Sequence, residues 1–153
     1  MTTDNDTGAN IRRTAVLILA VLGFIAAPLA SLETGFQTDL AYAQVRAVRL
    51  TYRGDGRWRV DVTVRHADEG WNHYADVWEI LDDENGTMLG ERILAHPHET
   101  EQPFTRSLSA VDIPKATRRV RIRAGCNVHG FGGREITADV PGAPDIGTVI
   151  VGP

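Results

Sequence analysis

The chain has 153 residues, of which 42% are hydrophobic, and its formal charge at pH 7 is −4. This length predicts one domain, and the acidic balance, without a lysine- or arginine-rich tract, argues against a nucleic-acid partner. The only cysteine is Cys126, so no internal disulfide can form. The thiol is therefore a buried structural group, an intermolecular link or a metal ligand.

Residues 1–43 are predicted to be a secretory signal. Arg12 and Arg13 precede an apolar run at 15–30, and Ala41-Tyr42-Ala43 offers an A-x-A cleavage site. The run is about 16 residues long, whereas a bilayer span needs about 20, so we predict no stable membrane span in the mature form. An uncleaved N-terminal anchor is the alternative. The two arginines also match weakly a twin-arginine export signal, and the predicted location is periplasmic or secreted.

The rest of the chain has the pattern of an all-β protein, with short alternating runs separated by turn residues. Seven strands are expected, near residues 48–52, 58–64, 74–81, 87–94, 105–113, 120–126 and 136–140. This spacing, with no helical period, predicts a seven-stranded immunoglobulin-like antiparallel β-sandwich over residues 44–141. Trp78 is expected in its core. Residues 142–153 are rich in glycine and proline and are predicted to form a flexible C-terminal tail.

The predicted topology collects the histidines at one pole. Successive strands run in opposite directions, so every second connection emerges at the same end of a sandwich. The connections after the second, fourth and sixth strands, with the adjoining strand ends, contain all the histidines of the chain. We therefore expect the following residues to lie together: His66, His73, His96, His98, Cys126 and His129.

Two short motifs in this set have metal-ligand spacing. Cys126 and His129 form a C-x-x-H at the mouth of a glycine-rich loop, so one turn delivers a thiolate and an imidazole. A core thiol beside a surface histidine is the alternative, and the convergence of the other histidines favours the ligand pair. His96-Pro97-His98 is an H-x-H, whose side chains project to one side of an extended backbone. Pro97 leaves the direction of the two side chains open, so the two histidines could equally be polar residues of a surface loop.

Two charged residues are expected to face inward near the histidine pole. Asp76 and Arg106 occupy inward positions of the predicted alternation. A buried unpaired charge is costly, so we predict that they pair with each other or orient a histidine.

The sequence resembles the superoxide reductases, the desulfoferrodoxin/neelaredoxin iron domain. Cys126-Asn127-Val128-His129-Gly130-Phe131 is similar to that family's Cys-Asn-x-His-Gly-Leu/Phe signature. His66, followed after six residues by His73-Tyr74-Ala75-Asp76-Val77-Trp78-Glu79-Ile80, is similar to its His-Pro-Met-x-x-x-His-Tyr-Ile-x-Trp-Ile-Glu-Leu stretch. The spacing is one residue longer here, and Ala67-Asp68 replaces Pro-Met. The resemblance covers roughly residues 60–134.

The resemblance implies a mononuclear non-haem iron with four planar histidines and one axial cysteine. By position, His66, His73 and His129 match planar ligands and Cys126 matches the axial thiolate. No histidine precedes His66, so His96 or His98 would have to supply the fourth. The implied reaction reduces superoxide, a small anion, to hydrogen peroxide with an electron from an external donor.

Two other functions remain open. A histidine cluster also suits copper or zinc, so the chain could be a non-catalytic metal-binding or protein-interaction module. The simplest alternative is an immunoglobulin-like adhesion or accessory domain whose histidines are polar loop residues. The sequence leaves the formation of a homo-oligomer open.

Overall fold

The computed structural model describes residues 37–152, so the predicted signal up to Phe36 lies outside the described part. The described residues form nine strands: β1 (Gln44–Gly54), β2 (Arg57–Arg65), β3 (Ala75–Asp82), β4 (Met88–Ile93), β5 (Phe104–Asp112), β6 (Arg119–Cys126), β7 (Gly130–Phe131), β8 (Ile136–Asp139) and β9 (Val149–Gly152). Each of the seven expected strands is present within a few residues of its predicted bounds. The prediction of seven strands is too low, because it misses the short β7 and β9.

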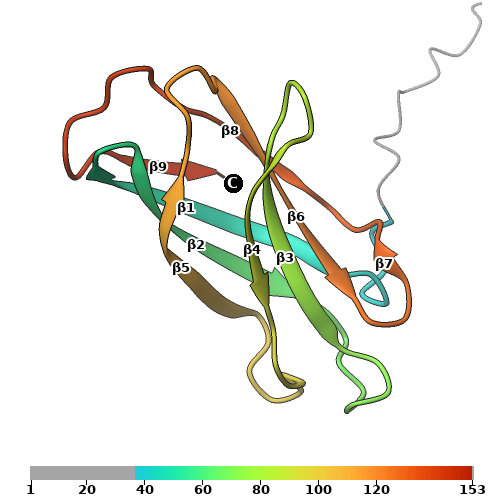
Figure 1. Ribbon diagram of the computed structural model, residues 1–153. Coiled ribbons are helices and arrows are strands. Elements are labelled where there is room, and N and C mark those ends of the chain that lie inside the picture. Colours follow the sequence, from blue (N-terminus) through green and yellow to red (C-terminus); the bar gives the residue numbers. More distant parts are fainter. Residues whose placement is uncertain (1–36, 153) are drawn as a thin grey trace, which may run out of the picture. The chain divides into compact units, whose positions relative to one another are not determined.

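The strands form two antiparallel sheets packed as a sandwich (Figure 1). One sheet has the order β5-β2-β1-β9, and the other has the order β4-β3-β6-β7, with β8 also paired to β6. The predicted all-β sandwich is therefore confirmed, whereas its immunoglobulin-like detail stays a prediction. Within residues 37–152, no helix is long and apolar enough to span a membrane.

The period-2 alternation of the sequence explains how each strand contributes to the core. On β2, Trp58, Val60, Val62 and Val64 are at most 1% exposed, and charged or hydroxyl residues separate them. Trp78 on β3 is fully buried, as predicted. The inward face of β6 ends at Cys126, which is 3% exposed. The alternation that builds the core thus carries the thiol to the end of a rigid strand.

The prediction of a flexible tail at residues 142–153 is wrong for β9. Val149–Gly152 pairs with β1 in the register Val48↔Gly152 to Thr51↔Val149. Ile150 packs against the core. The Gly/Pro content of the preceding segment hid a Val-Ile-Val run that completes the sheet beside β1.

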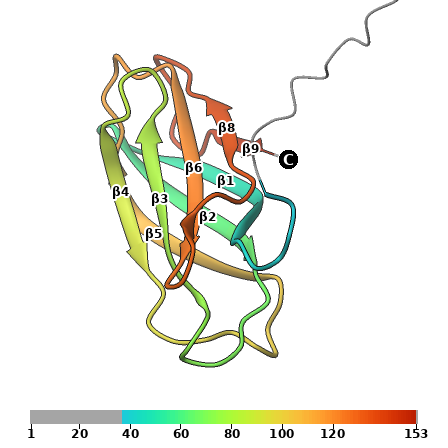
Figure 2. The same ribbon diagram turned by 90° about the vertical axis from the view of Figure 1, so that its right-hand side faces the viewer.

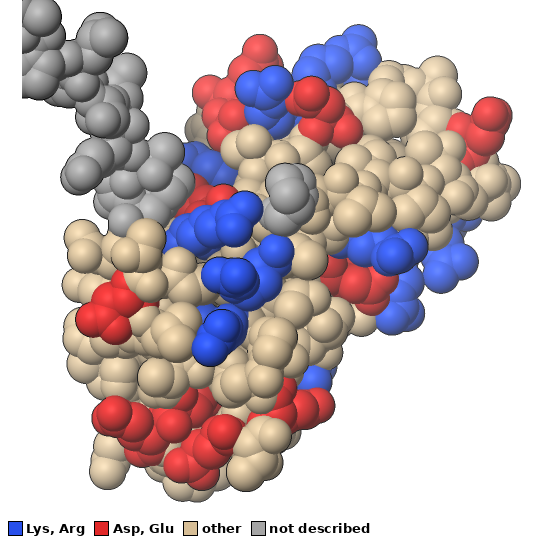
Figure 3. Space-filling model, turned by 180° about the vertical axis from the view of Figure 1, so that it is seen from behind, with Lys and Arg blue, Asp and Glu red and all other residues tan. Residues whose placement is uncertain are grey.

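The outer polar positions of β2 and β5 carry hydrogen-bonded charges. Arg59 Nη2 lies 2.8 Å from Asp61 Oδ1 and donates to Ser107 Oγ at 2.9 Å. Burial raises the pKa of the Asp61 carboxyl, but hydrogen bonds from Arg59 and Ser107 outweigh burial and hold the pKa below its usual value. Basic and acidic groups lie together on the face seen in Figure 3.

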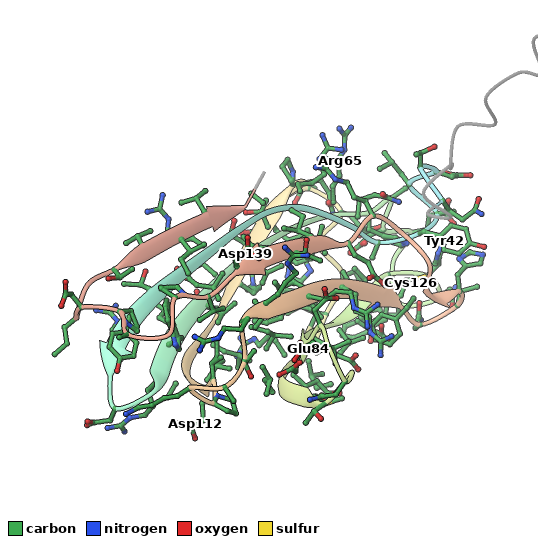
Figure 4. All side chains as sticks on the ribbon, turned by 90° about the horizontal axis from the view of Figure 1, so that it is seen from above. Tyr42, Arg65, Glu84, Asp112, Cys126 and Asp139 are labelled. Atoms are coloured by element: carbon green, nitrogen blue, oxygen red, sulfur yellow. The ribbon has the colours of Figure 1, made fainter. Side chains whose placement is uncertain are left out.

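The segment 37–43 that leads into β1 lies at the same end as the connections after β2 and β6 (Figures 1 and 2). Ala67 N–H donates to Leu40 O, and Val45 N–H donates to Arg134 O. Tyr42 and Cys126 lie near each other in Figure 4, far from Asp112. This end of the sandwich is the predicted histidine pole.

Two isoleucine truncations test the described core. Ile80 on β3 is fully buried and Ile93 on β4 is 59% exposed. We expect Ile80→Ala to lower the free energy of unfolding by about 2–5 kcal/mol, because it leaves a cavity. Ile93→Ala, the matched control, should cost below about 1 kcal/mol. Urea unfolding measures both, and equal losses would contradict the packing described here.

Candidate metal centre

Four potential ligand atoms surround the main-chain carbonyl oxygen of Ala41. His66 Nε2 lies 3.0 Å from this oxygen and His129 Nδ1 lies 3.1 Å from it. His73 Nε2 lies 3.3 Å away and Cys126 Sγ lies 3.6 Å away. Three imidazoles and the thiol thus converge on one point, and these are the four residues that the resemblance assigns by position.

The same four side chains also contact one another. Cys126 Sγ lies 3.7 Å from His73 Nε2 and 3.6 Å from His129 Nδ1. The ring centroids of His66 and His73 are 4.7 Å apart, and those of His73 and His129 are 4.9 Å apart. The ligand atoms of His66, His73 and Cys126 all lie within 4.8 Å of one another, a grouping that can hold a metal ion. His129 is not part of this grouping and joins the cluster through Cys126 Sγ and the Ala41 carbonyl oxygen.

Strand pairing brings His73 to Cys126. β3 and β6 are neighbours, with Ala75 opposite Cys126. Asn127 joins the two loops beyond this pair, because its Oδ1 accepts the Tyr74 N–H at 2.9 Å and its Nδ2 donates to Trp71 O at 3.3 Å. The asparagine of the C-N-x-H sequence therefore positions the loop that carries His73.

The conformation of the C-x-x-H turn is fixed by a contact within the turn and by packing of the residues next to it. His129 N–H points at Cys126 Sγ at 3.3 Å, and Gly130 has a φ of 65°, which favours glycine. The Phe131 ring packs against Gly125, where an added Cβ would meet it at 3.2 Å. Arg123 lies 4.0 Å above the same ring. These contacts fix the spacing of thiol and imidazole.

Asp68 is a site residue that the sequence analysis missed. Its side chain is fully buried, and its Oδ1 lies 2.6 Å from His66 Nδ1. Oδ1 also accepts the Ala75 N–H at 3.2 Å, and Oδ2 accepts the His98 N–H at 2.6 Å. The signal for it in the sequence is a carboxylate two residues after a histidine. Such carboxylate–histidine pairs orient metal-bound imidazoles.

The hydrogen bond to Asp68 determines what His66 presents to the cluster. A carboxylate accepts, so His66 Nδ1 carries the hydrogen and Nε2 of the neutral ring carries a lone pair. That lone pair faces the Ala41 carbonyl oxygen, which is also an acceptor, at 3.0 Å. A carbonyl oxygen has two lone pairs, so it cannot accept hydrogen bonds from all four surrounding groups. The excess of electron pairs at this point fits a bound cation.

The donor set also indicates which cations fit. Imidazole nitrogens suit zinc, copper and iron, and a thiolate suits softer ions, so three histidines and one cysteine fit a transition metal rather than calcium or magnesium.

His96 and His98 form a separate pair. Their ring centroids are 4.5 Å apart, and the His98 ring stacks on Phe104 at 3.8 Å. His98 is 3% exposed, and neither of its ring nitrogens has a hydrogen-bond partner among residues 37–152. Asp68 binds the His98 backbone, so all five histidines do lie at one end. Neither His96 nor His98, however, is among the groups around the Ala41 carbonyl.

The predicted pair of Asp76 and Arg106 is wrong. Arg106 Nη2 instead lies 2.8 Å from Glu101 Oε2, and its guanidinium lies 5.4 Å from the centre of the Phe104 ring. The loop before β5 supplies this nearer carboxylate. Burial raises the pKa of the Asp76 carboxyl, and its own backbone N–H and the positive charge that His66 carries when protonated offset this in part. Asp68, rather than Asp76, orients a histidine.

Comparison with known proteins finds one relevant relative. A protein of Halomicrobium mukohataei named "Putative lipoprotein" is 37% identical to this chain over 103 residues. The match covers 67% of this chain and 50% of the relative, so the chain spans about half the length of the relative. No protein-family model matches the chain. No solved structure matches it either.

Replacing Asp68 tests its part in holding the pole together. In Asp68→Asn the new amide places a donor against the His98 N–H or the His66 Nδ1–H, so one buried donor loses its partner. We expect the free energy of unfolding to fall by about 1–3 kcal/mol. Glu69→Gln is the matched control, because the Glu69 side chain is 75% exposed. Equal effects of the two variants in urea unfolding would contradict the assigned role.

We expect the free energy of unfolding to depend on pH through His98, at the histidine pole. Burial, with the charges of Arg106 and His96, lowers the pKa of the His98 imidazole. The unfolded chain therefore takes up this proton below about pH 6.5 while the folded chain does not, and the free energy of unfolding falls as the pH falls. We expect His98→Phe, which keeps a ring against Phe104, to weaken this fall between pH 7 and pH 5. His96→Gln is the exposed control, and a slope unchanged in His98→Phe would refute the assignment.

Proposed function

We propose that the chain is an exported transition-metal protein of the superoxide reductase type. The observation that carries the proposal is the convergence of His66, His73, His129 and Cys126 around one point. The side chains that contact the Ala41 carbonyl oxygen are the same four residues that the resemblance names. The N-terminal signal pattern and the name of the Halomicrobium relative support export to the periplasm or the exterior, either free or with an N-terminal anchor.

Iron is the metal that the resemblance favours for these ligands. Iron bound there would supply one electron to superoxide, which with two protons becomes hydrogen peroxide, and an external one-electron donor would restore the reduced ion. The Cys126 thiolate would contribute electron density to the metal. Neutral imidazoles add no negative charge, so the centre stays cationic and attracts an anion.

The burial of the ligands suits a small substrate. His66 and Cys126 are 1% and 3% exposed, whereas His129 lies at the surface. Asp68 holds the proton on His66 Nδ1, and Asn127 holds the loop of His73. The protein groups thus orient the ligands, and of the four only His129 is exposed.

A second function is favoured by the position of His96 and His98. Their rings contact each other, and the His98 ring stacks on Phe104, so the described cluster offers three imidazoles rather than four. A three-histidine, one-cysteine set also matches zinc or copper, and a domain that binds such an ion without turnover is the alternative. Superoxide consumption by the reduced iron form, compared with the metal-free chain, separates the two functions.

Spectroscopy of the iron-loaded chain tests the ligands. We expect oxidised iron to give a thiolate-to-iron charge-transfer band that disappears in Cys126→Ser. His73→Ala should reduce the iron bound per chain, whereas His96→Ala, an exposed histidine at the same end, should not. A band that persists in Cys126→Ser, or equal losses in the two histidine variants, would contradict the proposed site.

A further inference from the structure

We propose that the main-chain carbonyl oxygen of Ala41 is itself a ligand of the metal, which makes residues 37–43 part of the site. This inference rests on the proposed metal site and adds an oxygen to its three nitrogens and one sulfur. The oxygen belongs to the segment that precedes β1, on which neither the resemblance nor the sequence motifs place a ligand.

The distances around Ala41 O match the edges of a coordination shell. Metal–nitrogen and metal–oxygen bonds of about 2.0–2.2 Å place neighbouring ligands roughly 3.0 Å apart at right angles and roughly 3.4 Å apart at tetrahedral angles. The longer metal–sulfur bond, about 2.3 Å, lengthens an edge that includes sulfur. The three oxygen-to-nitrogen distances are 3.0, 3.1 and 3.3 Å, and the oxygen-to-sulfur distance is 3.6 Å.

Hydrogen bonding alone does not account for this arrangement. A carbonyl oxygen has two lone pairs, whereas four groups surround this one. His66 Nδ1 is engaged by Asp68, so in a neutral His66 ring Nε2 offers only a lone pair to the oxygen. A cation adjacent to the oxygen and to the grouped His66, His73 and Cys126 would bind the electron pairs that these groups present.

The segment is anchored so that the carbonyl is aimed at the cluster. Gln44 is 3% exposed, and its Nε2 contacts three main-chain oxygens, those of Gln37 at 2.8 Å and of Asp39 and Tyr42 at 3.0 Å. Its Oε1 accepts the Arg134 N–H at 3.0 Å. One side chain therefore gathers the segment into a turn and ties it to the loop after β7.

The glycine-rich loop is shaped to admit this segment. A Cβ at Gly133 would overlap the Ala43 carbonyl oxygen, and a Cβ at Gly132 would lie 2.9 Å from the Tyr42 ring. Tyr42 in turn lies with its ring centroid 5.0 Å from that of His129. The two glycines thus let residues 41–43 lie directly against the ligand loop.

Ligation by Ala41 has two chemical consequences. A carbonyl oxygen is a hard ligand, so it favours iron(II) or zinc(II) over copper(I). Cleavage after Ala43 would remove the oxygen, so ligation by Ala41 and the predicted cleavage site exclude each other. The working protein would retain the Ala41–Tyr42 peptide.

Selective isotope labelling can observe this one carbonyl. Ala41-Tyr42 is the only Ala-Tyr pair of the chain, and Ala43-Gln44 is the only Ala-Gln pair. The full chain, made cell-free with carbonyl-¹³C alanine, ¹⁵N tyrosine and ¹⁵N glutamine, gives one carbonyl-to-nitrogen NMR correlation for each pair. Ala43 is the internal control, since its carbonyl lies against Gly133 rather than the cluster. Zinc(II) alone is the probe, because it is diamagnetic.

We expect one equivalent of zinc to shift the Ala41 carbonyl resonance downfield and to shift that of Ala43 far less. In Gln44→Glu, which removes the donors that hold the segment, zinc affinity should fall by about 10-fold or more, the scale of supporting contacts at metal sites. A second sample with ¹³C-labelled cysteine reports on Cys126, the only cysteine of the chain. Zinc that shifts the Cys126 Cβ resonance but not the Ala41 carbonyl would overturn ligation by Ala41 and leave the side-chain site standing. If zinc shifts neither, both the metal site and ligation by Ala41 are refuted.

Discussion

The hydrogen bond from His66 to Asp68 is the interaction on which the site depends. It joins two fully buried side chains at 2.6 Å and fixes which nitrogen of His66 faces the cluster. The same carboxylate also binds the backbones of Ala75 and His98, so it links the loop after β2 to the start of β3 and to the loop after β4. Without this carboxylate, the connections that supply the histidines would lose their common anchor.

Strand pairing places the other side chains of the histidine pole. The register of β3 with β6 places Ala75 opposite Cys126, and Asn127 then ties the loop of His73 to the C-x-x-H turn. Residues 37–43 complete the arrangement from the N-terminal side, because Gln44 holds them over the ligands. Segments from three parts of the chain thus meet at the Ala41 carbonyl, although none of them is long.

Much of the fold could be predicted because it rests on local patterns. The alternation on β2 and β6 fixed both the strands and their buried faces, and antiparallel succession placed the histidines at one end. The Val-Ile-Val run of β9 was missed because its pairing with β1 spans most of the chain. The two-residue β7 is too short to leave a periodic signal.

The site was predicted only where the residue type itself suggests a ligand. His66, His73, Cys126 and His129 do lie together. The rings of His96 and His98 contact each other instead, because Asp68 holds the His98 backbone and the His98 ring stacks on Phe104. The carbonyl of Ala41 could not be found this way, since every residue has a carbonyl and only the fold aims this one. Likewise, Asp68 acts through its burial and its partners, which a sequence does not display.

X-ray absorption at the iron edge of the anaerobically loaded full chain tests the central claim most directly. We expect one sulfur neighbour at about 2.3 Å and nitrogen or oxygen neighbours near 2.1 Å, with multiple-scattering features of imidazole. A spectrum that contains no sulfur neighbour and no imidazole features would contradict it.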